Sequence, residues 1–206
     1  MQQVYVVTHP EATHHVDRLV GGWYDSNLTE QGHAQAERIA RFLGAAIPRD
    51  ATIQLVSSDL ARTAQTASVI GASLGVAVEF DVDLREKSYG VAEGRDQAWL
   101  DERFIFPPAQ GERLDHDEGI EGGETKRAWI ERAHAAVARI ERTDAGHRVI
   151  VTHGGTASWV IMAWMRIPID ACAYAMFKMP SGSVTILEED NRFHSRTLVT
   201  LGKRDF

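Results

Sequence analysis

The chain has 206 residues, of which 44% are hydrophobic and 25% are charged, and its formal net charge is -7. This length and composition suit one globular domain that buries a core, so we expect a single domain over residues 1–206. The acidic balance disfavours nucleic acid and anionic membranes as partners, and no apolar run is long enough to span a bilayer. One cysteine, Cys172, and a start without a signal-like segment favour a reducing cytoplasm.

Apolar, β-branched runs alternate with helical patterns along most of the chain. The runs predict strands at residues 2–7, 52–56, 76–80 and 148–152. The spacing of apolar residues predicts helices at 29–43, 60–74, 126–142 and 154–165, with Thr29 and Thr125 as caps. Residues 183–188 and 193–201 predict a terminal hairpin. The expected fold is a three-layer α/β/α sandwich around a mostly parallel mixed sheet.

The segment 88–123 has no clear period and contains Pro107-Pro108, Gly111, Gly119, Gly122 and Gly123, so we expect an insertion that acts as a lid. Residues 101–124 hold eight acidic side chains against two arginines. Such an acidic lid would repel substrates with several negative charges. It leads us to expect a monophosphate whose remainder is neutral or cationic.

Four polar side chains follow predicted strands. His9 follows the first strand, Arg62 and Glu86 lie beyond the next two, and His153 follows the fourth. Each alone could be a structural hydrogen-bonding group. Because the carboxyl ends of parallel strands share one edge of a sheet, we expect the four to converge there.

This set of side chains suits phosphoryl transfer. A neutral imidazole can attack phosphorus and carry the phosphoryl group as a covalent intermediate. A guanidinium and a second histidine can neutralise the charge on the equatorial oxygens. A carboxyl group can protonate the leaving oxygen and later take a proton from water. The scheme requires no metal and no cofactor.

Six ordered blocks carry a resemblance to a known family. They are His9-x-Glu11, the segment from Gly22 to Ala36, the segment from Ser57 to Ala67, the segment from Leu84 to Gly94, Gly122-Gly123-Glu124-Thr125, and Val151-Thr152-His153-Gly154-Gly155. In these blocks the chain resembles the histidine phosphatase superfamily, also called phosphoglycerate mutase-like. The resemblance implies a phosphoglycerate mutase-like fold, His9 as the phosphorylated nucleophile, Glu86 as general acid and base, and Arg62 with His153 as the phosphate clamp.

The chain departs from the family pattern around the nucleophile. Thr8 stands where the family has its first phosphate-binding arginine, and Pro10 replaces a glycine. Loss of one preorganised donor costs about 3 to 4 kcal/mol of transition-state stabilisation if nothing replaces it. Pro10 has no backbone N–H to donate and favours an extended His9.

His15 is the candidate for compensation, because it falls where the family often has an asparagine that contacts the phosphate. The alternative is that His14 and His15 are exposed, and Lys126 is a weaker substitute for the cation. The expected substrate-binding residues are therefore Arg62, Thr8, His15 and Gly154. A metal site from His14, His15, Asp115, His116 and Asp117 is disfavoured by their spacing.

The expected activity is hydrolysis of a small phosphorylated metabolite through a phosphohistidine, by a monomer or homodimer. One alternative is a catalytically weak or inactive pseudophosphatase that binds a phosphorylated ligand, motivated by Thr8 and Pro10. Retention of Glu86 argues against it, because a mere binder has no use for a general acid. The other is a phosphotransferase or mutase, for which segment 88–123 offers neither a longer insert nor extra cations.

Overall fold

The computed structural model describes residues 2–206, which form a six-stranded mixed sheet in the order β3-β2-β4-β1-β5-β6. The strands are β1 (Gln2–Thr8), β2 (Ile53–Ser57), β3 (Val78–Phe80), β4 (His147–Thr152), β5 (Val184–Glu189) and β6 (Arg196–Lys203). The first four run parallel to one another, and β5 and β6 form an antiparallel hairpin beside β1. This is the mostly parallel mixed sheet that the sequence predicts.

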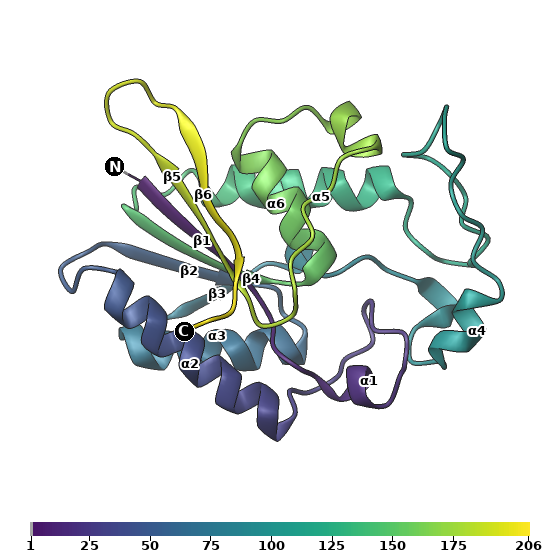
Figure 1. Ribbon diagram of the computed structural model, residues 1–206, viewed down its shortest axis with the longest axis horizontal. Coiled ribbons are helices and arrows are strands. Elements are labelled where there is room, and N and C mark those ends of the chain that lie inside the picture. The colour runs from purple at the N-terminus through teal and green to yellow at the C-terminus, as the bar shows by residue number, and fades with distance from the viewer. Residues whose placement is uncertain (1) are drawn as a thin grey trace.

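Helices cover both faces of the sheet, so the molecule has three layers (Figure 1). The helices are α1 (Thr13–Val16), α2 (Glu30–Ala46), α3 (Ala61–Leu74), α4 (Gln97–Asp101), α5 (Lys126–Ile140) and α6 (Gly154–Trp164), with short 3-10 turns at Val82–Leu84, Gly90–Ala92 and Ile169–Ala173. One core cluster joins α2 and α3 to the sheet, and another joins α5 and α6 to its opposite face. Burial of apolar surface on both faces explains the continuously apolar strands.

The helix starts follow the expected caps. The Thr29 hydroxyl accepts a hydrogen bond from the Gly32 N–H at 3.0 Å, and the Thr125 hydroxyl accepts one from Ala128 at 3.2 Å. Each bond satisfies a backbone donor that the first turn leaves free. The predicted caps of α2 and α5 are therefore confirmed.

The segment 88–123 is mostly irregular, as expected, but it carries the short helix α4 that sequence periodicity misses. An isolated bridge between Leu19 and Asp96 ties it to the rest of the fold, and another between Tyr89 and Gly123 joins its two ends. Its apolar residues form a small cluster around Leu100 that also includes Val20. Across residues 2–206, no helix has both the length and the hydrophobicity needed to cross a bilayer.

Candidate active site

Three neighbouring parallel strands end at the candidate site. His9 follows β1, His153 follows β4 and Ser58 follows β2, and these strands are adjacent in the sheet. The His9 N–H donates to the Thr152 carbonyl at 3.0 Å, which continues the β1–β4 ladder one step beyond the strands. The sheet topology therefore brings both histidines to one edge, with their rings 5.1 Å apart between centroids and edge to face.

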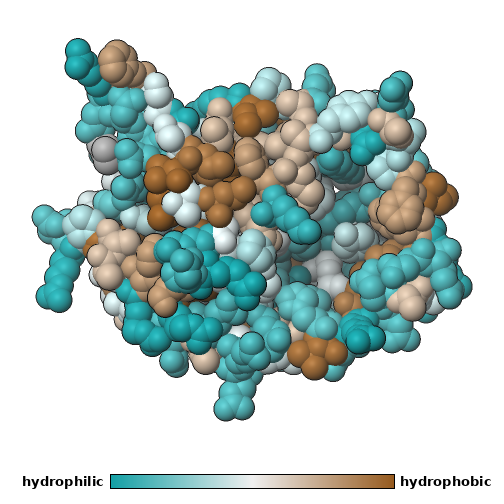
Figure 2. Space-filling model, viewed as in Figure 1, coloured by the Kyte–Doolittle hydropathy of each residue, from teal (hydrophilic) through white to brown (hydrophobic). Residues whose placement is uncertain are grey.

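His9 and His153 line a cavity of about 240 Å³. Figure 2 shows that this face of the molecule is hollowed between the sheet and the segment that carries α4, with mostly polar residues around the hollow. The cavity is lined by His9, His14, His15, Gly22, Arg62, Glu86, His153, Gly154 and Ser181. Of the predicted site residues, the fold brings six to this cavity and leaves out Thr8.

The backbone fixes the tautomer of His9. Its Nδ1 lies 2.8 Å from the Pro10 carbonyl oxygen, which can only accept, so Nδ1 carries the proton. The Nε2 lone pair is then free. Burial and the Arg62 charge hold the pKa of His9 well below its ordinary value, so the imidazole is neutral at neutral pH. A neutral Nε2 with a free lone pair is the form in which histidine is a nucleophile.

Arg62, in the first turn of α3, is a buried cation held by backbone carbonyls. Its Nη1 donates to Tyr24 at 2.7 Å and its Nη2 to Gly22 at 2.6 Å. Burial lowers its pKa to about 10, and its buried Nε has no hydrogen-bond partner among residues 2–206. A rigid guanidinium whose buried Nε–H is available to donate is suited to binding an anion.

His153 is fully buried between β4 and α6. Its Nε2 lies 3.0 Å from the Ser58 hydroxyl, while its buried Nδ1 has no partner within the described part of the chain. Burial and the Arg62 charge hold its pKa well below the ordinary value. The Ser58 hydroxyl can donate to Nε2, and Nδ1 then carries the proton and becomes a second donor to spare.

Glu86 lies at the N-terminus of α6. Its carboxylate accepts from the N–H groups of Gly155 at 2.9 Å, Thr156 at 3.1 Å and Lys87 at 3.1 Å, and from the Thr156 hydroxyl at 3.1 Å. All four contacts are donated to the carboxyl group, which fixes its position at the helix N-terminus. A Cβ at Gly155 would overlap the Trp129 ring and lie 2.8 Å from Glu86 Oε1, so this close approach requires glycine.

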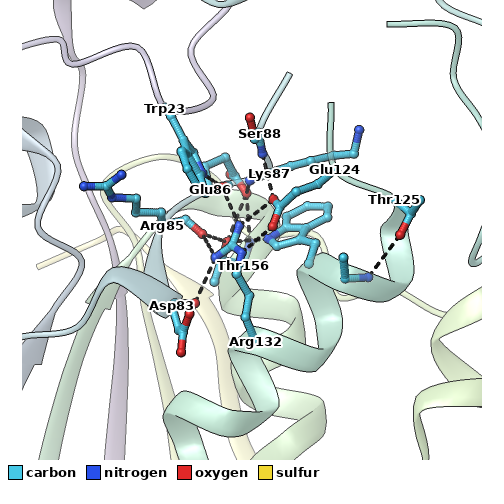
Figure 3. Close-up of polar contacts among 12 residues, drawn as sticks. Trp23, Asp83, Arg85, Glu86, Lys87, Ser88, Glu124, Thr125, Arg132 and Thr156 are labelled. Atoms are coloured by element: carbon cyan, nitrogen blue, oxygen red, sulfur yellow. Dashed lines mark hydrogen bonds and ion pairs between the residues drawn. The ribbon is translucent and has the colours of Figure 1, made fainter. Parts of the chain in front are cut away.

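Arg132 of α5 holds the segment around Glu86 and was not singled out by the sequence (Figure 3). It donates to the carbonyls of Asp83 at 2.9 Å, Arg85 at 2.6 Å and Glu86 at 2.7 Å. Its Nε donates to Glu124 Oε1 at 2.6 Å, and its Nη2 donates to Glu124 Oε2 at 2.8 Å. In the sequence, the only indication of this contact is that an arginine follows Glu124-Thr125 after two helical turns.

His15 lines the cavity with its tautomer also fixed. The backbone N–H of Ala12 donates to His15 Nδ1 at 3.2 Å, so the proton of the neutral ring is on Nε2. Burial lowers the pKa of His15, with a further contribution from Arg62. The His15 ring stacks on His9 with centroids 5.5 Å apart. Neighbouring His14 is buried, so the alternative that both histidines are exposed is wrong for His14, whereas it holds for His15, which is exposed.

The Thr8 hydroxyl is bonded away from the cavity. It donates to the Pro180 carbonyl at 2.7 Å and accepts from the Ser183 N–H at 3.0 Å. The same loop supplies the Ser181 hydroxyl and the Gly182 N–H, which donate to the His9 carbonyl at 2.8 and 3.0 Å. The side chain of Thr8 therefore fastens the loop behind His9, and the structure does not bring it to the cavity.

Three of the eight acidic residues in 101–124 pair with cations from outside that stretch. Lys87 pairs with Glu118, and Arg132 pairs with Glu124. Asp115 pairs with Arg127 at 2.7 Å. A charge count over segment 101–124 alone misses these partners. Within residues 2–206, no group of three or more His, Cys, Asp or Glu side chains is arranged to hold a metal ion.

A family model and a curated relative match most of the chain. A model of the histidine phosphatase superfamily (branch 1) matches residues 4–200. The probable phosphoglycerate mutase GpmB of Salmonella paratyphi C is 34% identical over 172 residues, covering 82% of this chain and 77% of the relative.

Two solved structures are similar over nearly the whole chain. The mycobacterial glucosyl-3-phosphoglycerate phosphatase complexed with VO3 has a TM-score of 0.77 and 26% identity, covering 98% of this chain and 99% of its own. YhfR of Bacillus stearothermophilus has a TM-score of 0.76 and 26% identity, covering 98% of each chain.

The six-stranded, mostly parallel sheet between two helical layers defines the class, an α/β protein of phosphoglycerate mutase-like fold. Within that class, the chain belongs to branch 1 of the histidine phosphatase superfamily.

Proposed function

We propose that this protein hydrolyses small phosphomonoesters through a phosphohistidine at His9. The observation that carries the proposal is the fixed tautomer of His9, whose free Nε2 belongs to the cavity that Arg62 and His153 also line. Each of those two side chains has a buried nitrogen without a partner among residues 2–206. Two such donors beside a nucleophile suit the equatorial oxygens of a phosphoryl group.

In the first step, His9 Nε2 attacks phosphorus and the bond from phosphorus to the alcohol oxygen breaks. The alcohol oxygen takes a proton from Glu86 as it leaves. In the second step, water attacks the phosphorus of the phosphohistidine and gives a proton to Glu86, the bond from phosphorus to His9 Nε2 breaks, and inorganic phosphate is released. Arg62, His153 and the Nε2–H of His15 stabilise the charge on the oxygens in both steps, with Gly154 forming part of the wall.

We propose that this chain binds phosphate in a way that differs from the family pattern, from which Thr8 and Pro10 both depart. Thr8 replaces the arginine of the family pattern, and we propose that His15 supplies a neutral hydrogen bond in place of that charge. The fixed Nε2–H of His15 and its position on the cavity wall support this assignment. In this proposal, the Thr8 hydroxyl positions the loop at 180–183 behind His9.

The test uses p-nitrophenyl phosphate with His9→Ala as the matched control, followed by acid quench for an acid-labile phosphohistidine. We expect turnover and labelling in the wild type and neither in the variant. Equal rates for the two proteins would contradict hydrolysis and leave the pseudophosphatase alternative. Transfer of the phosphoryl group to an added alcohol, at the expense of inorganic phosphate, would instead identify a phosphotransferase or mutase.

A further inference from the structure

The cavity of about 240 Å³ adjoins a larger one of about 520 Å³, and His14, His15, Gly22 and Glu86 line both. In the proposed function, the phosphoryl group occupies the first cavity and the alcohol portion of the substrate extends into the second. The oxygen that joins phosphorus to the alcohol then lies at the junction of the two. The side chains of the shared wall are therefore the ones placed to act on this leaving oxygen.

His14 is the titratable side chain of this shared wall that takes no part in the proposed steps. It is 7% exposed, and it also lines a third adjoining cavity, of about 320 Å³. Its ring packs against that of His15 with centroids 4.0 Å apart, and its centroid lies 6.0 Å from that of His9. His14 is thus held in the protein interior while it borders the space assigned to the substrate.

The Ser26 hydroxyl fixes the tautomer of His14. It lies 2.6 Å from His14 Nδ1 and also accepts from Arg62 Nη1 at 3.5 Å. Since a guanidinium can only donate, the hydroxyl hydrogen goes to Nδ1, the one acceptor that it contacts among residues 2–206. Burial lowers the pKa of His14 to about 3, so the ring is neutral and its proton is on Nε2.

The Nε2–H of His14 is a donor without an acceptor. The side chain makes its single hydrogen bond within the described residues to Ser26, through Nδ1. Gly21 leaves room for the opposite edge of the ring, because a Cβ there would lie 2.9 Å from both Cδ2 and Nε2. The φ of Gly21 is not positive, so it is space that requires glycine at this position. An oxygen at the junction of the cavities is the acceptor that this N–H lacks.

We propose that His14 is a further catalytic residue, whose Nε2–H donates to the oxygen that joins phosphorus to the alcohol. This inference rests on the proposed function and adds a second group at the leaving oxygen. When the bond from phosphorus to this oxygen breaks, the electron pair stays on the oxygen, which takes its proton from Glu86. His14 keeps its own proton throughout and stabilises the charge that develops on the oxygen.

The basicity of the leaving oxygen separates this role from others. A hydrogen bond strengthens with the negative charge of its acceptor, so a donor to the leaving oxygen matters more for phenol than for the less basic p-nitrophenol. A donor to the equatorial oxygens, or a side chain that only packs, affects esters of the two alcohols alike. The test therefore compares kcat/KM for phenyl phosphate and p-nitrophenyl phosphate, two esters of similar shape.

The variant His14→Phe keeps a ring and removes the donor. Because loss of one transition-state donor costs about 10² to 10³ in rate, we expect kcat/KM to fall by about 10² for phenyl phosphate and by only about tenfold for p-nitrophenyl phosphate. The amide nitrogen of His14→Gln can donate and should recover part of the ratio between the two substrates. Partial unfolding of a variant does not change this ratio.

Two further variants control for the change of side chain and of position. His33→Phe makes the same substitution at an exposed histidine of α2 and should leave the ratio unchanged. Gly21→Ala keeps the imidazole of His14 but displaces its Nε2 edge, so it should lower the ratio as His14→Phe does.

Two outcomes would overturn the inference. One is an equal effect of His14→Phe on both esters, or no effect on either, which would mean that His14 does not act on the leaving oxygen. The other is a wild type that turns over p-nitrophenyl phosphate through His9 but not phenyl phosphate. A wild type without any His9-dependent turnover would contradict the proposed function itself, so the two failures are distinguishable.

Discussion

Backbone hydrogen bonds give two histidines of the same cavity opposite tautomers. The Pro10 carbonyl places the proton of His9 on Nδ1, whereas the Ala12 N–H places the proton of His15 on Nε2. One ring therefore offers a lone pair to the cavity and the other offers a donor. Pro10, where the resemblance predicts a glycine, has no backbone N–H but keeps the carbonyl, so the contact that sets the tautomer of His9 is present.

The donor role of His15 can be tested by replacing its ring. In His15→Phe the ring shape remains and the donor is lost, so we expect kcat to fall by about 10² to 10³, the effect of removing one transition-state donor. In His15→Gln the amide nitrogen can reach the position of Nε2, and we expect part of that loss to be recovered. Equal activity of the wild type and His15→Phe would show that another group binds the phosphate.

The contacts of Thr8 predict that an arginine introduced at position 8 does not add a phosphate-binding group to the cavity. Thr8 is 1% exposed and its hydroxyl is bonded to the loop at 180–183. We expect Thr8→Val to lower the free energy of unfolding by about 1 to 3 kcal/mol, because it leaves the Ser183 N–H without this acceptor. Thr8→Ser keeps the hydroxyl and is the matched control.

Thr8→Arg should lose the same bonds, overfill the site and lower phosphatase activity together with stability. Denaturant unfolding and turnover of p-nitrophenyl phosphate measure the two effects. Higher activity in Thr8→Arg at unchanged stability would mean that the pocket lacks only a cation.

Periodicity and strand order were enough to predict the four parallel strands, the terminal hairpin and four of the helices. The same topology explains why the sequence alone could place His9 and His153 together, since both follow strands of one parallel sheet. What the sequence could not show is which way a side chain turns. Thr8 and His15 are both close to His9 in sequence, yet one faces a loop and the other the cavity.

The sequence alone also could not predict contacts between residues that are far apart in the chain. Arg132 acts on a segment 46 residues away through backbone carbonyls, which have no side-chain signature. Lys126 could be suggested only as a weak substitute for the missing arginine, because its half-buried place beside Trp159 depends on how α5 packs on α6.

Helix α5 positions Glu86 through Arg132, and this role predicts a specific kinetic effect. Lysine is a point charge that cannot bond three carbonyls and both oxygens of Glu124 together, so Arg132→Lys should let Glu86 shift. Since a shift of about 1 Å in a catalytic group costs about 10² in rate, we expect a kcat lower by about that factor with KM little changed.

The control for Arg132→Lys is Arg139→Lys on the same helix. Arg139 pairs with Asp81 and Asp83, its side chain is 43% exposed, and it lies outside the cavity. It should leave kcat unchanged. If Arg132→Lys lowers the melting temperature but folded protein keeps its kcat, the arginine is structural only and its assignment as a positioning residue is wrong.

Several histidines at the site are buried in the protein interior and are neutral there. Burial holds the pKa of His9 and His153 well below the ordinary value, and it lowers the pKa of His14 to about 3. In the unfolded chain these groups titrate near pH 6.5. Above that pH they are neutral in both states and contribute nothing to the pH dependence of stability.

Below about pH 6.5 the unfolded chain takes up protons that the native state does not, so each such histidine lowers stability by up to about 1.4 kcal/mol per pH unit. We therefore expect the melting temperature to be level from pH 8 to 7 and to fall steadily from pH 6.5 to 5. Carboxylates with lowered pKa values, such as Asp59 beside Arg85, lose their contribution only at more acidic pH and do not affect this window. Thermal unfolding in buffers of constant ionic strength, free of phosphate, measures the slope.

A matched pair of variants isolates the buried histidines as the cause of that slope. His14→Gln removes one buried titrating group and should make the fall between pH 6.5 and 5 shallower. His33→Gln removes an exposed histidine and should leave it unchanged. Inorganic phosphate should raise the melting temperature at each pH, because it binds the native cavity and not the unfolded chain. A melting temperature that stays level down to pH 5, or an equal slope in both variants, would show that these histidines take up protons in the native state.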